Sequence, residues 1–166
     1  MQIINLEYSH WEKAREIYIE AISTGHATFE AECPTAEEFD KKFLKSPRLA
    51  AIEDGEVAGW AGLKPVSPRY VYRGVAEESI YIAAKFRGRG IGKALLAKLV
   101  EESENNGIWT LHAGIFPENQ ASIKIHKDCG FRILGIEEKV GQMQGGEMKG
   151  RWRDVIIMER RSKKIF

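Results

Sequence analysis

The sequence predicts a single α/β (α+β) domain in which helices flank a central mixed sheet. Its 166 residues suffice for one domain with a substantial core and are too few for two. Segments with helical periodicity are interleaved with short strand-like segments along the chain. No internal repeat or low-complexity linker separates these segments, so residues 1–166 are expected to fold as one domain.

Two capping boxes predict two helices in the first third of the chain. In such a box, the N-cap side chain and the residue three positions later bond each other's backbone N–H groups. Ser9 and Glu12 match the first box. Apolar residues at helical spacing follow it: Trp11, Ala14, Ile17, Tyr18, Ala21 and Ile22. Thr35 and Glu38 match the second box, and Pro47 is expected to end that helix.

A β-hairpin and an alternation of strands and helices are predicted for the rest of the chain. Asp54 and Gly55 supply the positive φ angles of a tight turn between strands over 48–52 and 57–63. After an aromatic loop, the expected elements are a strand over 79–83, a helix that ends at Asn106-Gly107, a strand over 109–114, a helix over 119–129, a strand over 131–140, a glycine-rich loop over 141–150 and a strand over 154–159.

Composition and charge exclude several classes of function. Hydrophobic residues make up 43% of the chain and charged residues 30%, which is typical of a folded domain. A net charge of +1 favours neither nucleic acid nor an anionic membrane. No signal peptide or membrane-spanning run is evident, and Cys33 and Cys129 form no disulfide framework or metal motif. We expect a cytoplasmic protein without a metal, a nucleic-acid partner or a membrane partner.

The most informative segment is the turn that follows the strand over 79–83. It combines three glycines with three cationic residues: Arg87, Gly88, Arg89, Gly90, Ile91, Gly92 and Lys93. The turn leads directly into a helix, whose first backbone N–H groups have no partner within the helix. These N–H groups and the helix dipole attract anions, and glycines let a phosphate approach the backbone closely. The turn is therefore expected to bind phosphate.

Three phosphate-binding motifs can be compared with this turn. A Walker A loop needs Gly at position 87 and Ser or Thr at position 94, where this chain has Arg and Ala. A dinucleotide motif starting at Gly88 would need a third glycine at Lys93, and it opens a βαβ unit rather than following a hairpin. The pattern R-x-x-G-x-G is met by Arg87, Gly90 and Gly92. It resembles the pyrophosphate loop of GNAT acetyltransferases.

A second segment resembles the same family. Residues 119–131 are similar to the GNAT pattern N-x-x-S-x-x-x-[YH]-x-x-x-G-[FY]. The resemblance implies that Asn119 contacts the pantetheine arm of coenzyme A and that His126 faces its sulfur. Taken alone, Asn119 is equally explained as the first residue of a helix and His126 as a core-facing side chain. Together the two motifs imply acetyl-CoA as co-substrate and the GNAT fold, with a mostly antiparallel mixed sheet.

The resemblance extends over nearly the whole chain to the phosphinothricin and methionine sulfoximine N-acetyltransferases. Members carry an acidic residue four positions before the tyrosine of the central strand, where this chain has Glu77 before Tyr81. Arg73, the segment over 27–30 and the G-x-W-x-D segment over 150–154 also match. The resemblance therefore implies acetyl transfer to the amine of a small amino-acid-like substrate of the phosphinothricin, methionine sulfoximine or arsinothricin type.

The chain departs from this subfamily in two places. The loop over 141–150 is longer than usual, and it is expected to border the acceptor pocket. Glu78 stands beside Glu77, where many members carry a neutral residue. Both departures bear on which amine is accepted and leave the type of reaction unchanged.

The resemblance also assigns roles around the thioester. Pantetheine is expected to pair with the backbone of Ile80, Tyr81 and Ile82 like an added strand. A backbone N–H near Ile82 is expected to stabilise the oxyanion. His126 is expected to protonate the leaving sulfur, in the position where many relatives have tyrosine.

Three residues are expected to handle the acceptor amine. Glu77 is the expected general base, acting through a water, and the neighbouring charge of Glu78 would help to raise its pKa. Arg73 is expected to bind an acceptor carboxylate, and Phe29 to line the pocket. The alternatives are a solvent-facing Glu77 at the start of a strand, a solvated loop arginine, and a phenylalanine of the core.

Two other functions and one assembly are considered. Polyamines, aminoglycosides or a protein N-terminus are alternative acceptors, and an acidic pocket without Arg73 at its mouth would favour polycationic ones. A sensor that binds acyl-CoA without turnover is a third possibility, against which Glu77 and His126 argue. Relatives are commonly homodimers, so a homodimer through the C-terminal strands is expected.

Overall fold

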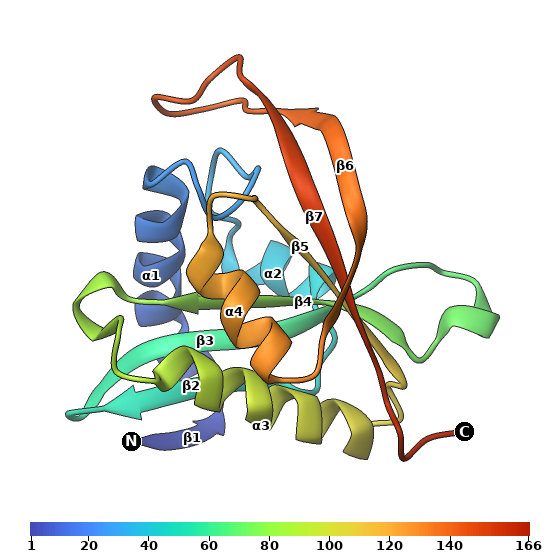
Figure 1. The fold of residues 1–166 in the computed structure, drawn as a ribbon. Helices are drawn as coiled ribbons and strands as arrows, with labels where there is room; N and C mark the ends of the chain where they lie inside the picture. The colour runs from blue at the N-terminus through green and yellow to red at the C-terminus, as the bar shows by residue number, and fades with distance from the viewer.

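The computed structural model describes residues 1–166 and consists of one seven-stranded sheet with four α-helices (Figure 1). The strands are β1 (Gln2–Asn5), β2 (Arg48–Glu53), β3 (Glu56–Pro65), β4 (Val75–Ile82), β5 (Thr110–Ile115), β6 (Arg132–Gln142) and β7 (Trp152–Arg161). The helices are α1 (Trp11–Ser23), α2 (Ala36–Lys42), α3 (Ile91–Asn105) and α4 (Gln120–Asp128). The predicted fold class, a mixed sheet with flanking helices, is confirmed.

The sheet has two antiparallel parts that meet at a short parallel pair. Its strand order is β1-β2-β3-β4-β5-β7-β6, and all neighbours are antiparallel except β4 and β5. These two strands pair over only three positions: Val75 with Thr110, Ala76 with Leu111, and Glu77 with His112. Beyond Glu77, β4 runs on to Ile82 with no strand on that side. The sheet therefore opens along the second half of β4.

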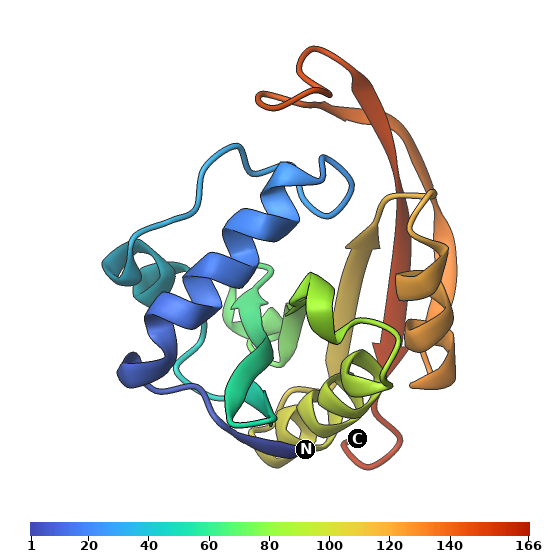
Figure 2. The ribbon, with the colours of Figure 1, turned by 90° about the vertical axis from the view of Figure 1, so that its left-hand side faces the viewer.

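Helices cover both faces of the part formed by β1 to β4. Figure 2 shows α1 and α3 on opposite sides of β3 and β4. On the α1 side, Trp60 is 1% exposed and packs edge-on against Tyr18, with 5.6 Å between ring centroids. On the other side, α3 contributes Leu95, Leu96 and Leu99, which are completely buried. This apolar burial on both faces holds β4 in place between two layers.

Several local predictions are confirmed. Asp54 and Gly55 have φ angles of 53° and 78°, and they join β2 to β3 as the predicted hairpin turn. Thr35 and Glu38 form the predicted capping box, with reciprocal bonds of 3.2 and 2.8 Å between side chains and backbone N–H groups. The last two strands and α4 lie within two residues of their predicted bounds.

Both predicted boundaries of the N-terminal helices need correction. Ser9 lies inside a 3-10 turn, η1 (Tyr8–His10), whose N-cap is Glu7, and α1 begins only after this turn. The second helix, α2, ends at Lys42 rather than at Pro47, because Phe43 adopts an extended conformation. Phe43 is nonetheless buried, so the core determines this boundary ahead of the proline.

Two strands differ from the prediction. β1 was not predicted, because its four residues are too few to display an alternating pattern. β4 begins at Val75 instead of position 79, since its first residues pair with both β3 and β5. Glu77 and Glu78 therefore lie inside the strand rather than ahead of it.

Three inspections of the chain define no site. None of the helices combines the length and apolar character needed to cross a membrane. No group of three or more His, Cys, Asp or Glu side chains could together hold a metal ion. Cys33 and Cys129 are free thiols.

Candidate functional site

Two adjoining cavities open where β4 and β5 diverge. The first, of about 910 Å³, lies between the end of β4, the turn over 87–93 and α4. The second, of about 510 Å³, lies between β4, the segment over 26–30 and the strands β5 to β7. Six residues line both cavities: His26, Ala27, Ile80, Tyr81, Asn119 and Ser122. A ligand in the first cavity can therefore present one end to the second.

The first cavity contains the predicted phosphate-binding turn. None of the backbone N–H groups of residues 88–93 donates a hydrogen bond to another backbone group. Gly88 and Gly90 have φ angles of 75° and 79°, and the space beside each is open. These unpaired donors at the N-terminus of α3 form a site for a diphosphate.

The three cations of this turn differ in where they lie. The guanidinium Nε of Arg87 donates to the carbonyl of the last β4 residue at 3.2 Å, which ties the turn to the strand. Lys93 also lines the first cavity and is 3.0 Å from Asp128. Arg89 does not line the cavity and instead pairs with Asp54 at 3.2 Å. The structure thus brings two of the three cations to the cavity.

The open edge of β4 offers backbone donors to the first cavity. Ala83 donates to the Ala58 carbonyl at 2.9 Å, so the N–H of Tyr81, two residues earlier, also faces β3. Because donor directions alternate along a strand, the N–H groups of Ile80 and Ile82 face the opening. All three predicted strand residues, Ile80, Tyr81 and Ile82, line this cavity.

Asn119 combines the two roles that the sequence left open. It is the N-cap of α4, and its side-chain oxygen accepts a 3.1 Å hydrogen bond from the Ser122 N–H. It also lines both cavities, directly below the open edge of β4. The helix-capping role therefore fixes a side chain that borders both binding spaces.

Phe29 lines the second cavity and packs against β6. Its ring lies edge-on to Phe116, with 5.0 Å between centroids. A Cβ on Gly141 would lie 2.7 Å from the Phe29 ring, so only glycine fits there without movement. Gly141 also lines the cavity, and the long loop therefore borders the acceptor space through its first residue.

Glu77 lines the second cavity from within β4. Its carboxylate is 2.9 Å from the Lys64 ammonium, which lies directly opposite on β3. The Glu77 side chain is 48% exposed. It is thus open to water and to the cavity at the same time.

His126 lies behind the cavity walls and lines neither cavity. It is completely buried, with Nδ1 at 2.7 Å from the Ser122 carbonyl and Nε2 at 2.9 Å from Oε1 of Glu78. Burial alone would lower the pKa of His126, but the charge and hydrogen bond of Glu78, together with the Ser122 carbonyl, raise it above the ordinary value. Neither nitrogen is free to reach a sulfur, so the predicted proton donation needs correction.

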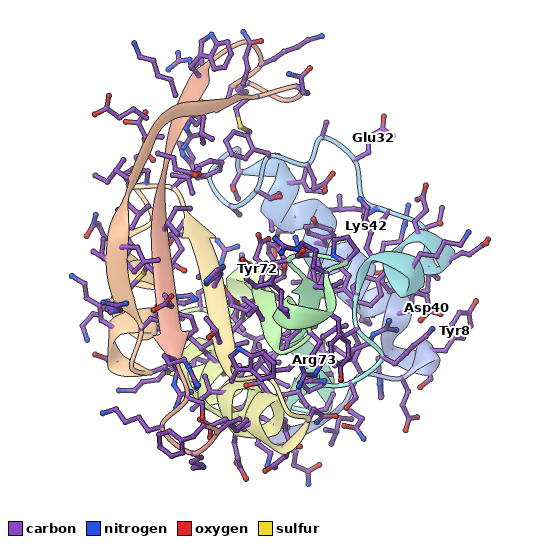
Figure 3. The ribbon with its side chains drawn as sticks, turned by 90° about the vertical axis from the view of Figure 1, so that its right-hand side faces the viewer. Tyr8, Glu32, Asp40, Lys42, Tyr72 and Arg73 are labelled. Carbon is purple, nitrogen blue, oxygen red and sulfur yellow. The ribbon has the colours of Figure 1, made fainter.

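Arg73 lies outside both cavities. It follows η2 (Tyr70–Tyr72) in the segment between β3 and β4, which projects from the sheet (Figures 1 and 3). Its guanidinium carbon is 4.3 Å from the Tyr70 ring centre and 5.1 Å from that of Trp109. The two aromatic faces hold the cation away from the acceptor space, so the predicted carboxylate contact is not made within this chain.

Arg153 is a residue whose part in the site the sequence analysis missed. It is 4% exposed, and it donates to the Gly25 carbonyl at 2.7 Å and to Glu118 at 3.2 Å. Its guanidinium carbon also lies 4.0 Å from the Phe116 ring centre. Arg153 therefore ties the segment after α1 to the turn before α4. It belongs to the G-x-W-x-D segment that the sequence singled out, but the motif alone indicates no partner.

Comparison with known proteins agrees with this geometry. Residues 10–131 match the model of the acetyltransferase (GNAT) family. A phosphinothricin N-acetyltransferase of Alcaligenes faecalis is 34% identical over 87% of this chain and 74% of its own length. An L-methionine sulfoximine/L-methionine sulfone acetyltransferase of Pseudomonas paraeruginosa is 37% identical over 67% of this chain and 62% of its own length.

A solved structure gives the same result. A GNAT superfamily phosphinothricin acetyltransferase from Sinorhizobium meliloti, in complex with acetyl-CoA, superposes with a TM-score of 0.86. The match covers 99% of this chain and 89% of that one at 29% identity. The chain belongs to the acetyltransferase (GNAT) family and is an acetyl-CoA-dependent N-acetyltransferase.

Proposed function

We propose that this enzyme acetylates the primary amine of a small amino-acid-like substrate of the phosphinothricin, methionine sulfoximine or arsinothricin type. The observation that carries the proposal is the meeting of two cavities along the open edge of β4. The larger cavity ends in free backbone donors and suits acetyl-CoA, and the smaller one suits a compact acceptor. The named activities of the two relatives support this class of amine.

Acetyl-CoA supplies an activated acetyl thioester, and the residues of the first cavity are suited to hold it. The N–H groups of residues 88–93, with Arg87 and Lys93, would bind the diphosphate. The outward N–H groups of Ile80 and Ile82 would pair with pantetheine, beside Asn119. The Ile82 N–H is also the donor that we assign to the developing oxyanion.

Glu77 is the general base in this proposal. The ammonium form of an amine must lose a proton before its nitrogen can attack, and Glu77 is the half-exposed carboxylate of the acceptor cavity. The exposure of its side chain allows transfer through one water and release of the proton to solvent. His126 has no part in protonating the leaving group, because both of its nitrogens are occupied.

A polycationic acceptor is the second candidate. Four glutamates line the second cavity, against a single lysine: Glu30, Glu77, Glu78, Glu137 and Lys64. Arg73 is absent from its lining. An acidic cavity of this kind favours a polyamine or an aminoglycoside over a substrate with several anionic groups.

We also infer that two copies of the chain associate through the C-terminal strands. Large apolar side chains are exposed on β6 and at the start of β7: Ile133, Leu134, Ile136, Val140 and Trp152. β6 is the edge of the sheet, and exposed apolar edges favour pairing. Light scattering after gel filtration should give a dimer mass, and Ile136→Glu should shift it to the monomer. A monomeric wild-type protein would contradict the inference.

A thiol-release assay with acetyl-CoA tests the proposed function. The acceptor panel contains phosphinothricin, L-methionine sulfone, spermidine, an aminoglycoside and a short peptide with a free N-terminus. We expect the highest kcat/KM with an amino-acid analogue. Preference for spermidine would select the second candidate, and binding of acetyl-CoA without release of thiol from any amine would identify a sensor.

A further inference from the structure

A second glutamate of the acceptor cavity has an oxygen without a partner. Glu78 is 8% exposed and lines the second cavity from β4. Its Oε1 meets Nε2 of His126 at 2.9 Å, whereas its Oε2 is buried and accepts no hydrogen bond. A buried carboxylate oxygen without a donor is unfavourable, so a donor is expected there when the site is filled.

The other end of the pair is firmly held. Nδ1 of His126 faces the Ser122 carbonyl at 2.7 Å, within the first turns of α4. The Phe131 ring lies edge-on to the imidazole, with 4.9 Å between centroids. Both ring nitrogens face acceptors, which favours the imidazolium form beside an ionised Glu78. His126 thus fixes Oε1 of Glu78 and leaves Oε2 as the one free acceptor.

The location of Glu78 indicates what the missing donor is. Residues on either side of the Glu78–His126 pair, Ile80 and Ser122, line both cavities. The free oxygen therefore belongs to the wall of the acceptor cavity close to its junction with the acetyl-CoA cavity. The group that must arrive at this junction is the acceptor nitrogen, which enters as an ammonium ion with three N–H donors.

We propose that Oε2 of Glu78 is the binding subsite for the acceptor's primary ammonium group, and that His126 is the positioning residue that orients it. This inference rests on the proposed function. Glu78 binds the nitrogen without taking its proton, because the neighbouring imidazolium stabilises the ionised carboxylate and makes it a weak base. Glu77, which pairs with Lys64 instead, remains the proton acceptor. Two adjacent carboxylates thereby divide orientation and deprotonation between them.

Steady-state kinetics of Glu78→Gln test this assignment. The variant keeps the shape of the side chain and an oxygen that can accept from His126. With the amine that the wild type turns over best, we expect KM for the amine to rise about ten- to a hundredfold, the loss of one charged hydrogen bond. KM for acetyl-CoA should stay unchanged. Glu138→Gln, on an exposed position of β6 outside both cavities, is the matched control and should leave both constants unchanged.

Two variants of His126 separate positioning from packing. His126→Gln keeps a donor for Glu78, and it should preserve most of the affinity for the amine. His126→Phe removes the donor, and it should raise KM for the amine as Glu78→Gln does, with acetyl-CoA affinity unchanged. Equal loss of affinity for both substrates in His126→Phe would indicate a merely structural role and contradict the proposal.

Calorimetry of amine binding in the presence of coenzyme A covers a variant that folds poorly. Wild-type protein should bind the amine at least tenfold more tightly than the hydroxyl analogue that lacks its nitrogen. Equal affinities would overturn the subsite, as would an unchanged amine KM in Glu78→Gln or a loss confined to kcat. Absence of turnover with every amine would instead contradict the proposed function, and the calorimetric comparison would still decide the role of Glu78.

Discussion

The two cavities are neighbours, but they are constructed differently. The acetyl-CoA cavity depends on consecutive residues of one turn, whose backbone N–H groups are directed by the start of α3. The acceptor cavity depends on side chains from β3, β4, β5, β6, β7, α4 and the segment after α1. Backbone donors are specified by local sequence, whereas converging side chains depend on strand pairing and helix packing. Substitutions in the two regions should therefore have separable effects.

The largest expected effect is on the chemical step in the acceptor cavity. Glu77→Gln should lower kcat by about 10²–10⁴-fold, because the amide cannot accept the ammonium proton. Acetyl-CoA affinity, measured by calorimetry, should remain that of the wild type. A variant with unchanged kcat would remove Glu77 as the base.

The next effect sharpens the dependence of the acceptor side on a long-range pair. His126→Phe leaves Glu78 as an unpaired buried charge and should lower the free energy of unfolding by about 3–5 kcal/mol near pH 6. The pKa of His126 is raised in the folded state, so its pairing is fully stabilising below the unfolded-state pKa of 6.5 and is lost as pH rises through the folded-state value. Urea unfolding from pH 6 to pH 9 should show the difference from wild type shrinking. A difference that grows with pH would contradict the ion pair.

A smaller effect tests the backbone donors alone. Gly90→Ala places a Cβ at a φ of 79°, which costs about 1–2 kcal/mol, so the turn relaxes and must be forced back to bind the diphosphate. Coenzyme A affinity should fall about tenfold, whereas amine KM should not change. Gly107→Ala is the matched control, since it has a φ of 76° and open space at the far end of α3. Equal affinities of the two variants would show that the turn does not bind coenzyme A.

The smallest effect concerns the shape of the acceptor cavity. Gly141→Ala puts a Cβ at 2.7 Å from the Phe29 ring and should displace it. Overpacking of this kind costs about 1 kcal/mol or more, so we expect amine KM to rise several-fold with acetyl-CoA KM unchanged. Gly135→Ala on the same strand, where no atom lies within 4 Å, is the control. A shift in acetyl-CoA KM would mean that the two cavities are not independent.

The outcomes of individual predictions follow the same division. Thr35, Asp54 and Gly55 behave as predicted, because a cap or a tight turn is decided by residues within four positions of one another. Ser9 had an equally good local pattern and still failed as a cap. Glu7 and His10 form a competing capping box around η1, one turn earlier in the chain.

The acceptor side shows where local patterns lose their power. Glu78 and His126 are 48 positions apart, and no spacing rule connects a strand residue to the face of a later helix. Arg73 is three residues from β4, yet its guanidinium is held by Tyr70 and Trp109. The distance of a residue from the site in sequence was therefore a poor guide to its distance in space.

By itself, the sequence determined the alternation of strands and helices and a phosphate-binding turn at residues 87–93. Both depend on contacts between near neighbours, and those contacts are present whatever the rest of the chain does. The tertiary structure alone decided that β4 and β5 part after Glu77, that Arg73 lies outside the acceptor cavity, and that His126 is the buried partner of Glu78. Those features are set by the register of distant strands and by the packing of α4. Their energies come from burial and pairing between segments that are far apart in the chain.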